Sequence, residues 1–227
     1  ADGMRIRGAF VPGGGFESLM SADYSQIEMR LMAHLSGDEA LIEAFNSGED
    51  LHRTMASMVF GTPVAEVSGE ERSRIKATSY GLAYGLSSYG LAAQLGIPVP
   101  EAAALRDRYF ERFGKVRDYL EGLVAQARAD GYTQTMFGRR RYLPDINSRN
   151  ATVRGYAERN AVNAPIQGTA ADIIKVAMIA IDRRLHEEQL QTKMILQVHD
   201  ELNFSVPQRE LDIVRHLVVE EMERAFS

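Results

Sequence analysis

The sequence predicts an α+β fold in which a small antiparallel sheet is interrupted by a long helical insertion. Strand patterns occur near both ends of the chain, at residues 16–22 and again at residues 194–198 and 202–206. Between residues 26 and 131 the apolar side chains instead recur with helical spacing. Strands from the two ends of the chain are therefore expected to lie side by side in one sheet.

The N-terminal segment is expected to form a β-hairpin. Residues 6–11 and 16–22 flank a Pro-Gly-Gly-Gly sequence at residues 12–15, which has the chemistry of a flexible turn. Asp23 would then lie at the end of the second strand.

A series of helices is expected next. Ile27, Leu31 and Leu35 would share one face of the first helix. Further helical patterns cover residues 41–45, 51–60, 70–86, 101–113 and 116–130. These segments form the predicted insertion.

Short strand patterns return at residues 132–137 and 141–143, and a long helical pattern follows at residues 153–187. Pro165 lies inside that helical pattern. Because proline lacks an amide hydrogen and clashes with the preceding turn, Pro165 is expected to begin or kink a helix.

The last part of the chain is expected to complete the sheet. Residues 194–198 and 202–206 would form a hairpin with an acidic tip. In its second strand, apolar side chains alternate with Asn203 and Ser205, which are expected to face outward. An amphipathic helix at residues 209–226 closes the chain.

The composition is that of an ordinary globular protein, with 227 residues, 45% hydrophobic content and 25% charged content. The chain has no cysteine, which excludes disulfides and thiolate metal sites and fits a cytoplasmic location. Its apolar runs, such as residues 176–181, fall short of the roughly 20 residues that cross a bilayer, so no membrane segment is expected.

The charge is unevenly distributed along the chain. The net charge of −5 argues against a uniformly basic nucleic-acid-binding surface. Six arginines nevertheless fall between residues 139 and 160, namely Arg139, Arg140, Arg141, Arg149, Arg154 and Arg159. A phosphate backbone is therefore expected to bind locally, at this segment.

Two carboxylates, Asp23 and Asp200, would approach each other if their strands are neighbours. Phosphoryl transfer by two divalent ions needs such a pair, because one ion activates a hydroxyl while the other stabilises the leaving oxygens. Magnesium suits a few carboxylates completed by substrate oxygens. Taken alone, however, an aspartate at a strand end is more often a turn or capping residue.

Arg72, Lys76, Tyr80 and Tyr84 are spaced four residues apart, which places them along one face of a predicted helix. Two cations suit a triphosphate, and two aromatic rings suit stacking on a base. The alternative is a solvated basic turn followed by aromatic core residues.

These motifs together resemble the family A DNA polymerases. Residues 23–30 (DYSQIEMR) resemble motif A, residues 72–85 (RxxxKxxxYGxxYG) motif B, and residues 197–202 (QVHDEL) motif C, in the family's order. Residues 138–144 and 158–173 are also similar to that family, so the resemblance covers nearly the whole chain.

The resemblance implies a fragment of the right-hand polymerase fold, with an antiparallel palm sheet and a helical fingers insertion. The expected domains are palm at residues 1–40, fingers at residues 41–131 and palm again at residues 132–227. The thumb is expected to be absent from this chain, because it and the earlier palm strands should precede Ala1, and a short segment should follow Ser227. Such a chain would bind primer-template weakly.

The resemblance also implies the site. Asp23, Asp200 and Lys76 would be catalytic, and Asp23 and Asp200, with a weaker contact from Glu201, would hold two Mg2+ ions, for which Mn2+ is expected to substitute. The nucleotide-binding residues would be Arg72, Lys76, Tyr80, His52, Gln26, Glu28 and Tyr84. The DNA-binding residues would be Arg159, Asn163, Gln167, His199, Arg139 and Arg140.

Two of the nucleotide-binding residues would select the sugar. Glu28 would exclude a ribose 2′-hydroxyl; the alternative is an exposed acid at a helix start, where it interacts favourably with the helix dipole. Tyr80 stands where many family members have phenylalanine. Its hydroxyl is expected to relax discrimination against dideoxynucleotides.

Three functions remain open on the sequence. The first is a DNA polymerase core that extends a primer-template with dNTPs as a monomer. The second is a DNA- or nucleotide-binding fragment of such an enzyme without turnover. The third is an unrelated metal phosphohydrolase around His199 and Asp200, against which the five histidines are scattered without a paired motif.

Overall fold

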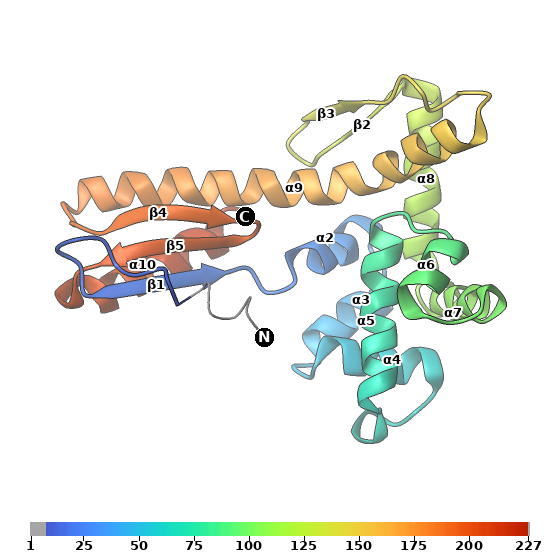
Figure 1. Ribbon diagram of the computed structural model, residues 1–227, viewed down its shortest axis with the longest axis horizontal. Helices are drawn as coiled ribbons and strands as arrows, with labels where there is room; N and C mark the ends of the chain where they lie inside the picture. Colours follow the sequence, from blue (N-terminus) through green and yellow to red (C-terminus); the bar gives the residue numbers. More distant parts are fainter. Residues whose placement is uncertain (1–7, 227) are drawn as a thin grey trace. The chain divides into compact units, whose positions relative to one another are not determined.

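The computed structural model describes residues 8–226, and these residues fold as the predicted mixture of helices and antiparallel strands (Figure 1). The chain packs as two compact units. The sheet unit combines the N-terminal segment up to Ile27 with the chain from Ala170 onward, and the helical unit is Glu28–Thr169. These boundaries differ from the predicted domain boundaries at 40/41 and 131/132, so the division into palm and fingers stays a prediction.

The sheet unit contains a three-stranded antiparallel sheet in the order β1-β5-β4. Its strands are β1 (Ser18–Asp23), β5 (Glu201–Val206) and β4 (Lys193–Val198). Strands from opposite ends of the chain therefore pair, as predicted. The central position of β5 explains one error: Asn203 and Ser205 are buried instead of exposed, because neighbouring strands cover them on both sides.

The first predicted strand is wrong over its described part. Residues 6 and 7 lie outside the described residues, and residues 8–11 form no strand. Gly8 weakens a strand and Pro12 cannot donate a ladder hydrogen bond. The segment instead meets the sheet through a side chain, since the Gly13 N–H donates to Ser205 Oγ at 3.3 Å.

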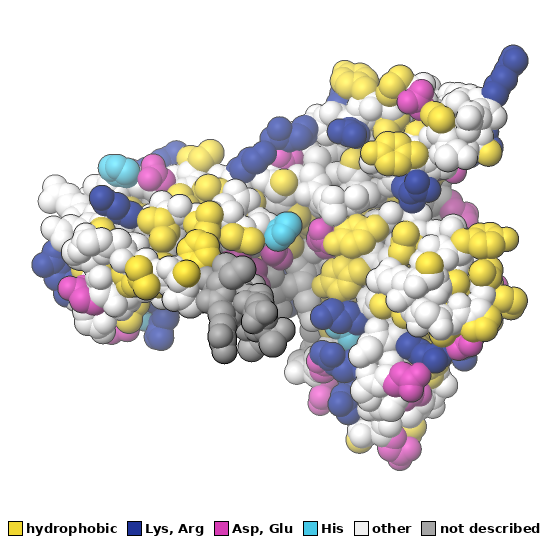
Figure 2. All heavy atoms as spheres, viewed as in Figure 1, with side chains coloured by type: hydrophobic (Ala, Val, Ile, Leu, Met, Phe, Trp, Pro, Cys, Tyr) yellow, Lys and Arg dark blue, Asp and Glu magenta, His cyan; other side chains and the backbone are white. Residues whose placement is uncertain are grey.

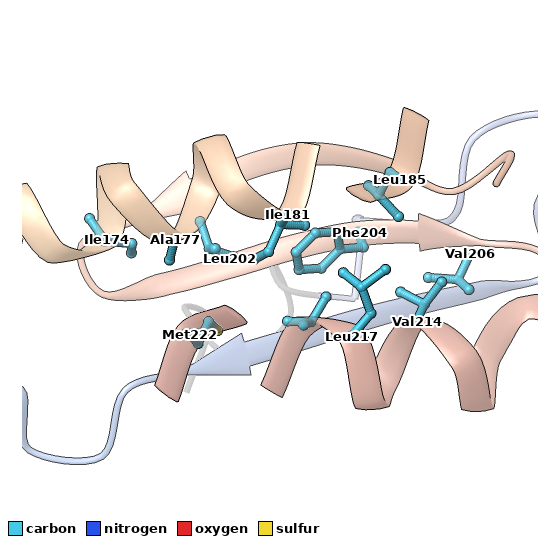
Figure 3. Packing of buried hydrophobic residues seen from close by; sticks show 11 residues of the cluster. Ile174, Ala177, Ile181, Leu185, Leu202, Phe204, Val206, Val214, Leu217 and Met222 are labelled. Carbon is cyan, nitrogen blue, oxygen red and sulfur yellow. The ribbon is translucent and has the colours of Figure 1, made fainter. Parts of the chain in front are cut away.

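Helices α9 (Ala151–Glu187) and α10 (Leu211–Arg224) pack on the sheet through one apolar cluster (Figure 3). Phe204 of β5 is fully buried in it. The remaining members are Ile174, Ala177, Ile181, Leu185, Leu202, Val206, Val214, Leu217, Val218 and Met222. The inward alternation of Leu202, Phe204 and Val206 is thus confirmed.

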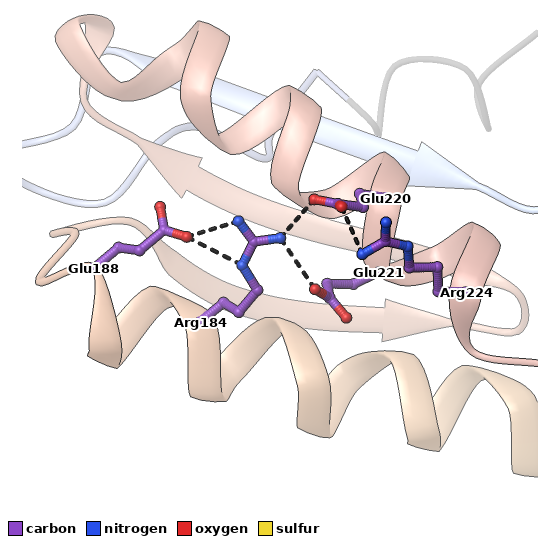
Figure 4. A network of polar contacts seen from close by, with 5 residues as sticks. All are labelled: Arg184, Glu188, Glu220, Glu221 and Arg224. Carbon is purple, nitrogen blue, oxygen red and sulfur yellow. Dashed lines mark hydrogen bonds and ion pairs between the residues drawn. The ribbon is translucent and has the colours of Figure 1, made fainter.

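A charged network joins the same two helices (Figure 4). The guanidinium of Arg184 on α9 contacts Glu188 at 2.7 Å, Glu220 at 2.7 Å and Glu221 at 3.0 Å, and Arg224 contacts Glu220. The hydrogen bond from Arg184 lowers the pKa of Glu220, followed by the charge of Arg224. Because these groups are partly exposed, the network fixes the helix pairing more than it adds stability.

Helix α9 continues through Pro165, so Pro165 does not begin a helix, and a kink there stays a prediction. The hydroxyl of Thr169 donates to the Pro165 carbonyl at 2.6 Å and accepts the Met136 N–H at 3.1 Å. Among the described residues, α9 is also long and apolar enough to span a membrane by length and composition alone. The core helix of a soluble protein passes the same test, and Ile174 and Ile181 pack in the core.

The helical unit contains α2 (Ile27–Ser36, beginning at the unit boundary), α3 (Glu39–Asn46), α4 (Leu51–Phe60), α5 (Gly69–Ala83), α6 (Ser88–Leu95), α7 (Val99–Arg112) and α8 (Gly114–Asp130). A short hairpin of β2 (Tyr132–Gln134) and β3 (Arg140–Tyr142) follows. The 3-10 turns are Val64–Glu66 in this unit and Gln208–Glu210 in the sheet unit. The predicted helices are confirmed, whereas α6 was not predicted.

Side-chain caps set where several of these helices begin. Asp50 caps α4, and Ser68 and Glu71 form a reciprocal capping box at the start of α5. Ser87 caps the unpredicted α6, which ends at the left-handed Gly96. Serine before and glycine after an apolar stretch was the signal that could have predicted α6.

Replacing Phe204 with alanine is predicted to destabilise the sheet unit by about 3–5 kcal/mol, because it leaves a cavity in a fully buried cluster. The matched change Val219→Ala, on the exposed side of α10, should cost less than about 1 kcal/mol. Urea unfolding measures both. Equal losses would show that this cluster is not the core.

Candidate active site

The pairing of β1 with β5 brings three acidic residues to one end of the sheet. Asp23, the last residue of β1, lies opposite Glu201, the first residue of β5. The Tyr24 N–H donates to the Asp200 carbonyl at 3.2 Å, so the turn between β4 and β5 lies beside the end of β1. His199 occupies this turn with a left-handed backbone (φ 54°). The predicted approach of Asp23 and Asp200 is therefore present.

Among the described residues, these three acids have no ion-pair partner. No basic side chain within residues 8–226 forms a recorded ion pair with Asp23, Asp200 or Glu201. Burial raises the pKa of Asp23, and the negative charges of Asp200 and then Glu201 raise it further. A bound cation would relieve this repulsion.

The donor set fits a magnesium ion that substrate helps to hold. The donors are carboxylate oxygens, which Mg2+ prefers. Within the described part of the chain, no cluster of three or more His, Cys, Asp or Glu side chains is arranged to enclose an ion by itself. Asp23 and Asp200 can therefore supply part of a coordination shell that needs substrate oxygens.

Tyr24 anchors the strand end that carries Asp23. Its hydroxyl donates to the Met222 carbonyl of α10 at 2.7 Å, and burial raises its pKa to about 12. This role of Tyr24 was not predicted, because its partner Met222 lies near the other end of the chain. Gln26 follows in a left-handed conformation (φ 57°), at the turn into α2.

In the helical unit, α5 carries Arg72, Lys76 and Tyr80 of the predicted row, and Tyr84 follows as the residue that caps its end. The rings of Tyr80 and Tyr84 lie 6.4 Å apart, and that of His52 lies 6.0 Å from Tyr80. Tyr84 is 37% exposed and Tyr80 is half-buried, whereas Ile75 and Leu82 form the buried side of α5. The alternative of aromatic core residues is therefore wrong.

The two cations of the row differ in their surroundings. Arg72 is held by Asp50 through two hydrogen bonds, Nε to Oδ1 at 2.9 Å and Nη2 to Oδ2 at 2.8 Å. Lys76 is exposed and has no recorded ion pair in the described part of the chain. Arg72 is thus oriented, and Lys76 is a mobile point charge.

His52 is buried beside these cations. It is 1% exposed, and neither ring nitrogen has a hydrogen-bond partner. Its pKa is lowered to about 4, first by burial and then by the charges of Lys76 and Arg72, against an opposing contribution from Asp50. His52 is therefore neutral at pH 7.

Glu28, Tyr84 and Gln167 form one hydrogen-bonded group. The Tyr84 hydroxyl donates to Glu28 Oε2 at 2.7 Å. Burial raises the pKa of Tyr84 well above its usual value, the bond to Glu28 raises it further, and a contact with Gln167 opposes this. The structure thus connects the predicted sugar-selecting acid with a predicted DNA-binding residue.

A polar groove of about 500 Å³ lies between the β2–β3 hairpin and α9. It contains four predicted DNA-binding residues, Arg139, Arg140, Asn163 and Gln167. It is completed by Thr133, Gln134, Thr135, Arg141, Asn160, Ala164 and Gly168. Thr133, Gln134 and Asn160 were not predicted to bind DNA. Hydrogen-bond donors next to a run of arginines were the signal that could have predicted them.

Two polar atoms within this groove lack partners. Asn163 Oδ1 and Thr133 Oγ1 are buried without a hydrogen bond. Gly168 is required here, because a Cβ would lie 2.6 Å from Thr135 Cγ2. The arginine and amide side chains that line the groove suit a ligand that offers both phosphates and hydrogen-bonding edges.

Arg159 does not line the groove. It lies against Gly85, where an added Cβ would be 3.0 Å from Arg159 Cα, and its guanidinium lies 5.8 Å from the ring centre of Tyr156. Gly85 thus allows the close approach of Arg159.

The family model described as DNA polymerase family A matches residues 1–227. The chain belongs to DNA polymerase family A. It is 62% identical over 224 residues to DNA polymerase I of Mycobacterium tuberculosis and 51% identical over 226 residues to DNA polymerase I of Caldicellulosiruptor bescii. Alignments cover 99% and 100% of this chain but 25% and 26% of those relatives, so the chain spans about a quarter of their length.

A solved structure confirms the predicted fold class for this family A chain. The POL domain of Pol1 from M. smegmatis, in complex with DNA primer-template and dNTP, matches with a TM-score of 0.95 and 59% identity. The match covers 99% of this chain and 40% of that one. The helices and antiparallel sheet thus form part of a polymerase domain.

The stability of the chain is predicted to rise with pH between about 4 and 6.5 because of His52. Its pKa is about 4 in the folded chain, so the unfolded chain, with a pKa near 6.5, binds more protons in this window. The stabilisation from keeping His52 neutral in the folded chain is complete above about pH 6.5 and is lost below about pH 4.

Urea unfolding across this pH range measures the effect. His52→Gln should flatten the slope, and the exposed His216→Gln is the matched control. An unchanged slope in His52→Gln would contradict the assignment.

Proposed function

We propose that this chain is the catalytic core of a template-directed DNA polymerase, which transfers deoxynucleotides from dNTPs to a primer 3′-hydroxyl using two divalent ions. The observation that carries the proposal is the close approach of Asp23 and Asp200, whose like charges raise the pKa of Asp23 and which have no ion-pair partner among residues 8–226. Family membership and the likeness to a polymerase domain whose structure contains primer-template and dNTP support it.

Asp23 and Asp200 would hold Mg2+, with a weaker contact from Glu201. Mn2+ would substitute, since it takes the same oxygen ligands. When bound, the ions lower the pKa of the attacking hydroxyl and stabilise the leaving oxygens. The protein supports this by fixing both acids at the end of a paired sheet, with Tyr24 anchored to α10.

In the helical unit, Lys76 and Arg72 would bind the triphosphate and stabilise charge on the departing pyrophosphate. Tyr80 and Tyr84 would line the position of the base and sugar, and Glu28, held by Tyr84, would exclude a 2′-hydroxyl. His52 would act as a neutral hydrogen-bond donor to phosphate, since its pKa is about 4. Gln26 is also assigned to the nucleotide.

The groove beside α9 would bind the DNA. Arg139 and Arg140 would contact phosphates, and Asn163 and Gln167 would donate to acceptors in the minor groove that every correct base pair presents. Arg159 and His199 would contact the primer-template outside this groove. Figure 2 shows acidic and basic side chains interspersed on the face it draws, so DNA binding is assigned to local sites.

We further propose a monomer in the cytoplasm that does not enter a membrane. The absence of cysteine suits a reducing compartment. Four apolar residues of α9, Ile174, Ala177, Ile181 and Leu185, pack in the core.

Single-nucleotide extension of a labelled primer-template with Mg2+, using the full-length protein that carries this sequence, tests the proposal. Asp200→Ala is predicted to lower the rate on the order of a thousand-fold, because the ions contribute several kcal/mol and each ~1.4 kcal/mol is a tenfold factor. Asp212→Ala, which removes an exposed acid of α10, should leave the rate unchanged.

Template-matched extension that is lost only in Asp200→Ala supports the enzyme. Binding of primer-template and dNTP without extension by the unmodified protein would instead identify a binding protein without turnover.

A further inference from the structure

Asp50 holds one edge of the Arg72 guanidinium. Its Oδ1 accepts from Nε at 2.9 Å, and its Oδ2 accepts from Nη2 at 2.8 Å. Paired parallel bonds of this kind fix the plane of a guanidinium as well as its position. Arg72 therefore has a defined orientation before any ligand arrives.

The carboxylate that does this is itself fixed. Asp50 is the N-cap of α4, where Oδ1 accepts the Arg53 N–H at 2.9 Å and the carbonyl accepts the Thr54 N–H at 2.9 Å. Helix α4 is held by fully buried Met55 and Ala56. The bond from Arg72 also lowers the pKa of Asp50 to about 2, so the carboxylate stays charged.

The opposite edge of the guanidinium is open. Arginine has five N–H groups, and Asp50 takes one on Nε and one on Nη2. The other three, on Nη1 and Nη2, have no recorded partner among the described residues, and the side chain is 35% exposed. This Nη1–Nη2 edge can bind two phosphate oxygens in parallel.

We propose that Asp50 is a positioning residue that aims the Nη1–Nη2 edge of Arg72 at the triphosphate of the incoming nucleotide. The inference rests on the proposed function and adds to it a residue that the motif leaves out. Lys76 provides the contrast, because an ammonium is a point charge that needs no orientation.

The negative charge of Asp50 has an opposing effect on phosphate binding. Asp50 also reduces the net charge near Arg72, which disfavours phosphate. Both side chains are more than a third exposed, so solvent and salt screen this charge effect. Screening does not weaken the geometric effect, and positioning therefore dominates.

Asp50→Asn tests the inference in the full-length protein that carries this sequence. Asparagine keeps the size and the helix cap but loses the charge and the second acceptor. The KM for dNTP is predicted to rise about tenfold, because binding of the triphosphate is weakened, and kcat is predicted to fall as well, because Arg72 also stabilises charge on the departing pyrophosphate. The melting temperature and the affinity for primer-template should not change.

Two further variants separate positioning from folding and charge. Asp50→Ser also keeps the cap and should raise the KM at least as much as Asp50→Asn. Asp118→Asn makes the same charge change at an exposed site on α8, where the side chain is 70% exposed, and should leave the KM unchanged.

A double-mutant cycle tests whether Asp50 acts through Arg72. In an Arg72→Ala background, Asp50→Asn is predicted to add nothing to the KM. An equal increase in both backgrounds would overturn the inference. So would an unchanged KM in Asp50→Asn, and a lowered KM would make Asp50 a competitor of the phosphate.

Equilibrium binding of a fluorescent dNTP gives the same comparison without turnover. Absence of extension by the unmodified protein would contradict the proposed function. The ratio of the dissociation constants for dNTP of Asp50→Asn and the unmodified protein would still decide the role of Asp50. A ratio near one would overturn it.

Discussion

The antiparallel pairing of β1 with β5 is the interaction on which the candidate site depends. It places the end of a strand from the start of the chain opposite a strand from its last thirty residues, as the Asp23–Glu201 register shows. A one-residue slip would turn Asp23 to the other face of the sheet. The buried Phe204 cluster and the Tyr24 hydroxyl bonded to Met222 oppose such a slip.

The two units contribute different chemistry. The sheet unit concentrates negative charge that repels itself, which raises the pKa of Asp23 and favours a cation. The helical unit presents the cations and rings of α5 together with a polar groove that contains unpaired donors and acceptors. Both arrangements destabilise the folded chain unless a bound ligand neutralises the charges or pairs with the polar groups. This is typical of sites for binding and catalysis.

Local patterns predicted most of this arrangement and failed where the partner is distant in sequence. The β4–β5 hairpin and the α5 row follow from spacing alone, and Asp23 and Asp200 followed from motifs. The bond between Asp50 and Arg72 joins different helices, and no periodicity reports it. The burial of His52, Asn203 and Ser205 likewise depends on which elements cover them.

Binding of Mn2+, measured by electron paramagnetic resonance on the full-length protein with dNTP present, tests the central claim most directly. The account predicts that Asp23→Asn and Asp200→Asn each weaken binding or remove a bound ion, whereas the exposed Asp182→Asn changes neither. Unaltered Mn2+ binding in both Asp23→Asn and Asp200→Asn would show that this carboxylate pair is not the metal site.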